Sequence, residues 1–271
     1  MKAVALAEAH AESVYGGKAV QLGRAIRAGL PVPPGIALSF SLVEKVANGD
    51  DAGATALDEI WGKLRRPLAA RSSAVGEDSE AASFAGQHLT RLNVLSPAEL
   101  VDAVHAIWAS ARSPSALGYR ARLGLAGEPK IGAVVQELVD PDCAGVLFSR
   151  NPLDGSDEIV IEASWGLGEA VVAGLVTPDR FRLSREGTVL ERTVGVKDIA
   201  VRIALEGGTR EAAVVDARRS VLCLDDATLG ELRALNLRCE EVFGGDNDLE
   251  WAIAGGSVYL LQRRPVTRAI V

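Results

Sequence analysis

The chain has 271 residues, of which 48% are hydrophobic and 24% are charged. These values are ordinary for a globular protein, and the length allows a sizeable core in one large domain or in two lobes. The net charge of −7 argues against a nucleic acid or a membrane surface as partner, but local Arg and Lys side chains could still hold a small anion.

The cysteine content and the N-terminus bear on the compartment. The three cysteines, Cys143, Cys223 and Cys239, are odd in number and lack metal-ligand spacing, which favours a reducing compartment. The first residues contain no signal-peptide pattern, and no apolar run approaches the ~20 residues of a membrane span. The sequence therefore predicts a cytoplasmic protein.

Residues 15–40 predict a Gly-Gly turn, a short helix and a strand. Apolar residues recur at helical spacing from Ala19 to Ile26, Gly29 ends the helix, and prolines follow it. Residues 36–38 read as a strand, and two helices are expected at residues 41–47 and 55–64. Lys18 lies directly after the turn, and a solvated surface lysine is the interpretation that this segment alone favours.

Residues 68–93 contain the first candidate site. A buried strand is predicted at residues 68–70, followed by Arg71, the pair Ser72 and Ser73, and the small-residue run 81–86. Arg offers a planar fork of donors to phosphate oxygens, and small residues allow backbone N–H groups to approach closely. This loop suits an oligophosphate, and a polar surface loop is the alternative.

The middle of the chain predicts alternating elements. A helix is expected over residues 96–122, starting with a capping box of Ser96 and Glu99. Strands are expected on both sides of a turn at residues 140–142, then at 159–163 and onward to about residue 201, with a helix at 227–243. The Gly-x-Gly at residues 166–168 lacks the third glycine of a dinucleotide site.

Residues 248–265 predict a β-hairpin around Gly255 and Gly256. Gln262 and Arg264 share a face of their strand because side chains alternate. Glu250 lies on the other strand of the hairpin, and it can share this face only if the loop between the two strands has an odd number of residues. A three-residue loop centred on Gly255, with Gly256 as a bulge residue, meets this condition. An ordinary surface hairpin is the alternative.

Four segments together resemble one family. The strings GGKAVQLGRAIRAGLPVPPG, RSSAVGEDSEAASFAGQ, EASWGLGE and LLQRRP are similar, in this order, to signatures of the nucleotide-binding domain of phosphoenolpyruvate synthase, pyruvate phosphate dikinase and rifampin phosphotransferase. The resemblance implies an α+β, ATP-grasp-like fold with two lobes, mostly antiparallel sheets and a nucleotide cleft between the lobes. We expect the lobes at residues 1–134 and 135–271. Ala19 and Glu137 depart from the usual family residues, and the segment 41–66 is shorter.

The resemblance also implies roles for individual residues. Lys18, Arg71 and Arg264 would contact the ATP phosphates and act in catalysis, and Glu250 and Gln262 would hold Mg²⁺. Gln136, with the backbone of Glu137, Leu138 and Val139, would bind adenine. Glu169 would lie near the nucleotide, and a carboxylate at the start of a helix is the alternative. Carboxylate and amide oxygens are suitable Mg²⁺ ligands.

The expected function is therefore that of the ATP-binding part of a dikinase-type phosphotransferase. None of the three histidines, His10, His88 and His105, lies in the Gly/Ser/Thr-rich context of a phosphohistidine. We expect Mg-ATP to be bound and its phosphate to pass to a phosphohistidine domain on a separate chain. A stand-alone kinase or ligase acting on a small molecule, or a non-catalytic ATP-binding regulator, are the alternatives.

Overall fold

The computed structural model describes residues 2–76, 89–122 and 127–266. Its backbone contacts divide the chain into two compact units. The first comprises Met1–Arg27, Pro33–Leu138 and Leu205–Gly208, and the second Ala28–Val32, Val139–Ala204 and Thr209–Val271. Each unit is described by itself below. In the part of the chain that is described, no helix is long and apolar enough to cross a membrane.

The first unit is built on a five-stranded antiparallel sheet with the strand order β1-β2-β5-β3-β4. Its strands are β1 (Ala3–Ala5), β2 (Gly35–Leu38), β3 (Leu68–Ala74), β4 (Thr90–Val94) and β5 (Ile131–Glu137). The helices are η1 (Leu6–Glu8), α1 (Glu12–Tyr15), α2 (Gly17–Arg27), α3 (Phe40–Ala47), α4 (Asp51–Lys63), α5 (Pro97–Ser110) and α6 (Pro114–Arg122).

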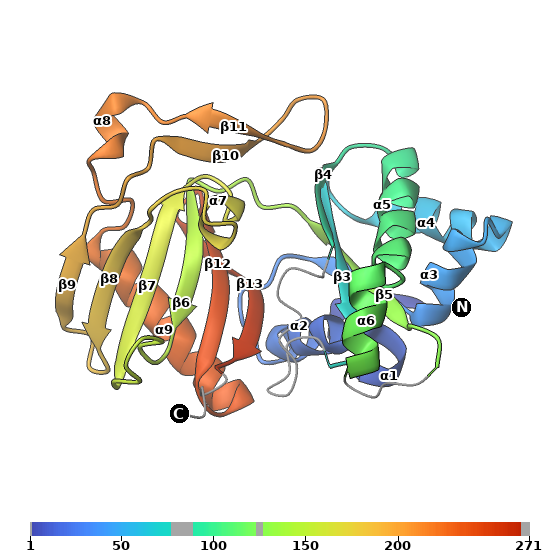
Figure 1. Ribbon diagram of the computed structural model, residues 1–271, viewed down its shortest axis with the longest axis horizontal. Coiled ribbons are helices and arrows are strands. Elements are labelled where there is room, and N and C mark those ends of the chain that lie inside the picture. The colour runs from blue at the N-terminus through green and yellow to red at the C-terminus, as the bar shows by residue number, and fades with distance from the viewer. Residues whose placement is uncertain (1, 77–88, 123–126, 267–271) are drawn as a thin grey trace. The chain divides into compact units, whose positions relative to one another are not determined.

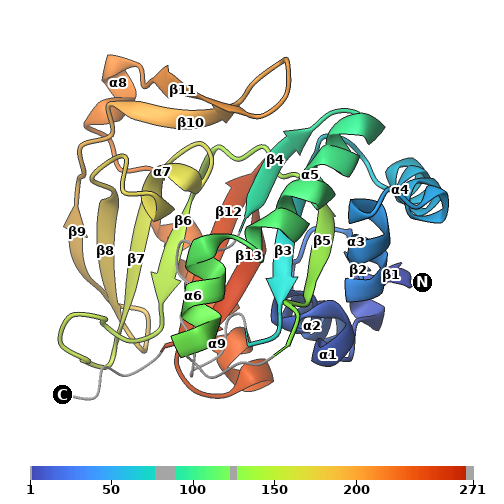
Figure 2. The ribbon, with the colours of Figure 1, turned by 45° about the vertical axis from the view of Figure 1, so that its right-hand side comes forward.

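The two faces of this sheet have different coverings. Leu68 and Ala70 of β3 belong to a core with α3, α4 and α5, in which Leu42, Leu57 and Leu100 are almost completely buried. Figure 2 shows α3 and α5 against the sheet. Because side chains alternate along a strand, the residues between those of the core project from the opposite face, where α1 and α2 contact the sheet.

The second unit contains a six-stranded antiparallel sheet with the order β13-β12-β6-β7-β8-β9, and a separate two-stranded sheet of β10 and β11. The strands are β6 (Cys143–Phe148), β7 (Glu158–Trp165), β8 (Asp179–Ser184), β9 (Val189–Thr193), β10 (Ile199–Ile203), β11 (Thr209–Ala213), β12 (Asn247–Ala254) and β13 (Ser257–Pro265). Its helices are α7 (Glu169–Val172), α8 (Asp216–Arg219) and α9 (Asp226–Phe243).

The six-stranded sheet has one apolar face and one mixed face. The apolar face carries Leu147, Phe181 and Trp251, all at most 1% exposed, and α9 runs across it (Figure 1). Along the same strands the alternate residues, such as Glu162 and Glu250, are only partly buried. This mixed face is termed the open face below. The candidate side chains Glu250, Gln262 and Arg264 lie on it.

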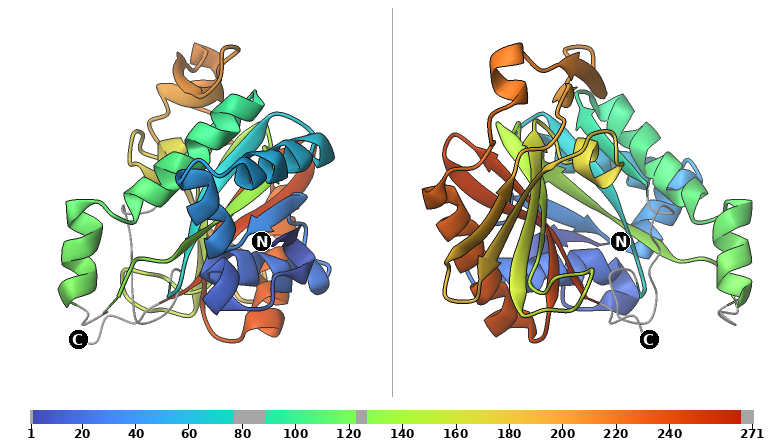
Figure 3. Two further views of the ribbon diagram at one scale, coloured as in Figure 1. Left: turned by 90° about the vertical axis from the view of Figure 1, so that its right-hand side faces the viewer. Right: turned by 60° about the vertical axis from the view of Figure 1, so that its left-hand side comes forward.

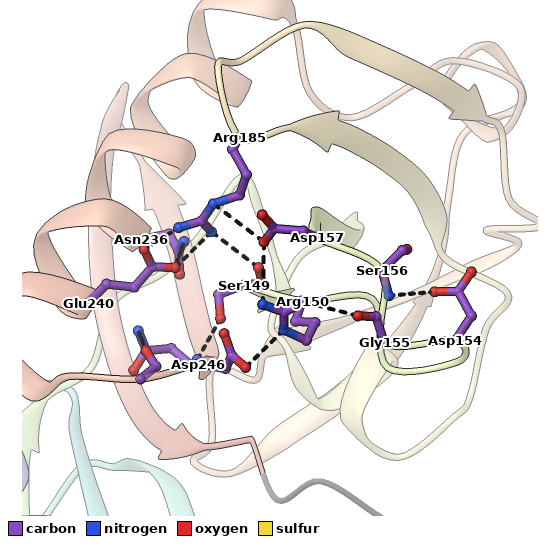
Figure 4. A network of polar contacts seen from close by, with 12 residues as sticks. Ser149, Arg150, Asp154, Gly155, Ser156, Asp157, Arg185, Asn236, Glu240 and Asp246 are labelled. Atoms are coloured by element: carbon purple, nitrogen blue, oxygen red, sulfur yellow. Dashed lines mark hydrogen bonds and ion pairs between the residues drawn. The ribbon is translucent and has the colours of Figure 1, made fainter.

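A polar network ties α9 to the ends of the sheet strands (Figure 4). Arg185, in the turn after β8, forms an ion pair with Glu240 of α9 and donates to the Ser149 carbonyl oxygen at 3.2 Å. Arg150 contacts Asp246 with Nε at 3.0 Å from Oδ2. Both arginines are about a quarter exposed. Their contacts hold α9 and the residue before β12 against the turns at this end of the sheet.

The α+β class with mostly antiparallel strands is confirmed, and two local expectations described here are wrong. The strand that starts at Leu68 continues to Ala74, so Arg71 lies within β3 and not in a loop. Residues 96–122 form two helices, because Pro114 cannot continue α5. The strands expected on both sides of residues 140–142 are present as β5 and β6, which belong to different sheets.

Candidate functional site

The loop that precedes α2 fits closely against β3. Gly16 has a φ of +84°, and a Cβ atom there would lie 2.1 Å from the Ser73 carbonyl oxygen. The Ala19 backbone N–H donates to Ser73 Oγ at 3.1 Å. Lys18, in the first turn of α2, is 3% exposed and its Nζ donates to the Ser72 carbonyl oxygen at 3.0 Å. The Gly-Gly turn therefore holds the lysine at a fixed place beside β3.

A glycine is required at position 16 both for conformation and for space, which leads to a stability prediction. We expect Gly16→Ala to lower the free energy of unfolding by about 3 kcal/mol, since strain at positive φ adds to a backbone clash. Gly49→Ala is the matched control, because Gly49 has a φ of +72° but no atom within 4 Å of an added Cβ. Urea unfolding of both variants measures the difference, and equal losses would contradict the close fit.

Arg71 projects from the same face of the five-stranded sheet as Ser73, two residues along β3. Arg71 is 9% exposed, and Gln136, which is 4% exposed, is the register partner of Ala69 on that face. The structure of this unit therefore brings the predicted phosphate ligands, Lys18 and Arg71, to the sheet face that also carries Gln136.

The predicted adenine segment is partly engaged within the unit. Gln136 Nε2 donates to the Pro33 carbonyl oxygen at 3.1 Å, and the Glu137 carboxylate binds Arg65 with Oε2 at 3.0 Å from Nη2. The backbone N–H groups of Glu137 and Leu138 donate to the carbonyl oxygens of Pro34 and Pro67. The side chain of Glu137 is thus directed to Arg65, which explains how a carboxylate is tolerated there.

In the second unit, Glu250 of β12 and Gln262 of β13 are direct register partners. Arg264 Nη2 donates to Glu250 Oε1 at 3.0 Å, and Arg264 Nη1 lies 3.7 Å from Asp248 Oδ2. The side chains of all four residues belong to the open face, at the edge of the six-stranded sheet. The expectation that Glu250 shares a face with Gln262 and Arg264 is confirmed.

The expected reason for this shared face is wrong. Ala254 pairs with Ser257, so the connection is a two-residue turn of Gly255 and Gly256, with φ values of +55° and +74°. Positive φ at both positions is the pattern of a type I′ turn. The extra residue is Leu261: the pairing shifts between Glu250 and Trp251, and this bulge restores the common face.

The donor set at this edge fits a magnesium ion. Glu250 supplies a carboxylate and Gln262 an amide oxygen, and Mg²⁺ commonly takes one or two protein oxygens together with phosphates and water. Among the described residues no group of three or more His, Cys, Asp or Glu side chains could hold a metal, so a metal here would depend on the phosphates as well. Arg264 adds a positive charge next to Glu250.

Asp248 was not predicted, although the alternation of Asp248 and Glu250 on a strand could have revealed that they share a face. Glu169 is the first residue of α7, which contacts β6 and β7, and a Cβ at the preceding Gly168 would lie 3.7 Å from Ala144 Cβ. The predicted loop residues 77–88, including His88, lie outside the described residues.

Comparison with known proteins gives a family match. Residues 50–270 match the model of the pyruvate phosphate dikinase AMP/ATP-binding domain. The chain is 37% identical to an uncharacterized phosphotransferase, YvkC, of Bacillus subtilis, over 93% of this chain and 33% of that protein. It is 39% identical to a rifampicin phosphotransferase of Streptomyces sviceus, over 83% of this chain and 26% of that protein.

A third relative is a probable phosphoenolpyruvate synthase of Methanothermobacter thermautotrophicus, 34% identical over 94% of this chain and 44% of that protein. The chain thus spans between a quarter and less than half of the length of these relatives. The matched range 50–270 includes Arg71, Gln136, Glu250 and Gln262 but not Lys18.

Proposed function

Because the chain belongs to the pyruvate phosphate dikinase AMP/ATP-binding domain family, we propose that it binds Mg-ATP and transfers phosphate to a histidine of a phosphohistidine domain. The observation that carries this proposal is the edge of the six-stranded sheet, where Glu250, Gln262 and Arg264 share one face. A carboxylate, an amide oxygen and a guanidinium side by side suit a metal-bound polyphosphate.

The first unit supports the proposal through Lys18. A cation in the first turn of a helix is unfavourable, since the helix N-terminus favours negative charge. Lys18 is nevertheless held there, 3% exposed, by its hydrogen bond to Ser72. A phosphate would be stabilised by the lysine and by the helix N-terminus together. Arg71, from the same sheet face as Ser73, is proposed as a second phosphate ligand.

We propose that Gln136 and the segment 137–139 bind adenine. The backbone N–H groups of Glu137 and Leu138 are already hydrogen-bonded, so the nucleobase contacts fall to carbonyl oxygens and to the N–H group of Val139. Mg²⁺, when bound by Glu250 and Gln262, would neutralise the charge that develops on the transferring phosphoryl group. Arg264, released from Glu250, would contact a phosphate oxygen.

The acceptor is the second part of the proposal. The relatives named as phosphotransferases and synthases are more than twice as long as the matched region, which supports a need for further domains. Phosphoryl transfer requires donor and acceptor to be positioned together. We therefore expect this chain alone to bind ATP and to transfer its phosphate slowly, chiefly to water.

The test uses ATP labelled in the β- or γ-phosphate, with Mg²⁺, in the presence and absence of a protein that carries an exposed phosphohistidine motif. We expect an acid-labile phosphate on the partner and faster ATP consumption when both proteins are present. Calorimetry without detectable ATP binding would overturn the ATP site. Fast transfer from ATP to a small molecule by this chain alone would replace the proposal with a stand-alone kinase.

A further inference from the structure

The open face of the six-stranded sheet carries one continuous row of side chains. Gln262 pairs with Glu250, Glu250 with Val146, Val146 with Glu162, and Glu162 with Arg180. Register partners in an antiparallel sheet project from the same face. With neighbouring strands ~4.8 Å apart, Glu162 lies two strands, about 10 Å, from Glu250. The row therefore begins at the proposed metal ligands and continues past an apolar residue to a second charged pair.

The charged side chains on this face differ in whether they have hydrogen-bond or ion-pair partners. At one end of β7, Arg182 binds Glu158 with Nη2 at 2.8 Å from Oε2 and Glu191 with Nη1 at 2.9 Å from Oε2. The hydrogen bonds from Arg182 hold the pKa of Glu158 and of Glu191 below the usual range. In contrast, within the described residues the side chains of Glu162 and Arg180 make no hydrogen bond or ion pair, and Arg180 Nε is buried without an acceptor.

A third polar group belongs to the same place. Ser164 lies two residues from Glu162 on β7 and therefore on the same face, and it is 1% exposed. Its Oγ atom has no hydrogen-bond partner among the described residues. The start of α7 approaches the register partner of Ser164, Ala144, from this side of the sheet. Because buried polar groups are normally hydrogen-bonded, Ser164 Oγ and Arg180 Nε, which lack partners beside the partly buried Glu162, indicate a missing ligand.

The chemistry of the cluster selects the ligand. Glu162 accepts hydrogen bonds and Arg180 donates them, and as register partners of opposite charge they favour a neutral ligand that can do both. A hydroxyl group donates one hydrogen bond and accepts others, so a pair of neighbouring hydroxyls can donate to Glu162 and accept from Arg180 and Ser164. We propose that Glu162, Arg180 and Ser164 form the subsite for the ribose hydroxyls of the nucleotide whose phosphates are bound at Glu250 and Gln262.

This inference rests on the proposed binding of Mg-ATP and assigns one part of that ligand to residues whose role was not predicted from the sequence. The test is calorimetric titration of the full chain, with Mg²⁺, against ATP, 2′-deoxy-ATP, 3′-deoxy-ATP and GTP. We expect the unchanged protein to bind ATP about tenfold or more tightly than at least one deoxy analogue, the size of a lost hydrogen bond to a charged group. Glu162→Gln should remove most of this preference.

The controls separate the possible outcomes. Glu241→Gln removes an exposed carboxylate from α9 and should leave the preference unchanged. Ser164→Ala should weaken ATP binding. It should not change the affinity for the deoxy analogue that lacks the hydroxyl bound by Ser164. Unchanged discrimination in Glu162→Gln would overturn the subsite while leaving the ATP site intact. If Glu162→Gln instead changed the preference for ATP over GTP, Glu162 would be assigned to the binding of the base. Absence of ATP binding by the unchanged protein would overturn the proposed function itself.

Discussion

Glu250→Gln is expected to lower the rate of ATP consumption by about 100-fold or more, with little change in the stability of the fold. The substitution keeps the shape of the side chain but removes the negative charge that faces Arg264 and, when bound, Mg²⁺. A carboxylate that holds the metal against the transferring phosphate contributes several kcal/mol to transition-state stabilisation, and about 1.4 kcal/mol corresponds to a tenfold change. The effect should therefore appear in kcat as well as in Mg²⁺-dependent binding.

The measurement is ATP turnover at several Mg²⁺ concentrations with the partner protein present. Glu241→Gln is again the matched control, since it makes the same chemical change on the exposed side of α9. Gln262→Ala should have a smaller effect than Glu250→Gln, because it removes a neutral ligand. Full activity of Glu250→Gln at saturating Mg²⁺ would exclude this residue from the metal site.

The sequence predicted the fold class and the shared face of the residues at the sheet edge, but not the β-bulge that produces this shared face. The α+β, ATP-grasp-like class follows from signatures that the family match confirms. The alternation of side chains along a strand predicted that Gln262 and Arg264 share a face. Either a β-bulge or a three-residue loop would put Glu250 on that face, so alternation alone does not distinguish the two. Two consecutive glycines favour a two-residue turn, so the extra residue moved to Leu261, where no sequence signal marks it.

The subsite at Glu162 could not be predicted for a different reason. Glu162 and Ser164 lie inside a matched string, but Arg180 belongs to another strand, and only the register of β7 with β8 makes it the neighbour of Glu162. The pairing of distant strands depends on tertiary packing, which local periodicity does not specify. The same applies to Gln136 and Arg71, which come to one sheet face through the pairing of β3 with β5.

The largest effect on stability is expected at a buried ion pair that links three segments of the second unit. Asp179, the first residue of β8, and Lys197 form an ion pair in which both side chains are 0% exposed. The Asp179 carboxylate also accepts from the backbone N–H groups of Gly195 and Cys223, each at 2.8 Å. One carboxylate thus fixes the start of β8, the segment before β10 and the segment before α9.

Asp179→Ala should lower the free energy of unfolding by about 3–5 kcal/mol, because it leaves the Lys197 ammonium buried without its partner and two backbone N–H groups without acceptors. Lys197→Met should cost less than Asp179→Ala, since the two backbone N–H groups still bind the carboxylate. The double variant Asp179→Ala/Lys197→Met should be more stable than the sum of the single losses predicts, because no ammonium remains buried. Urea unfolding of the three variants gives the coupling energy. A strictly additive cycle would show that the two charges do not depend on each other.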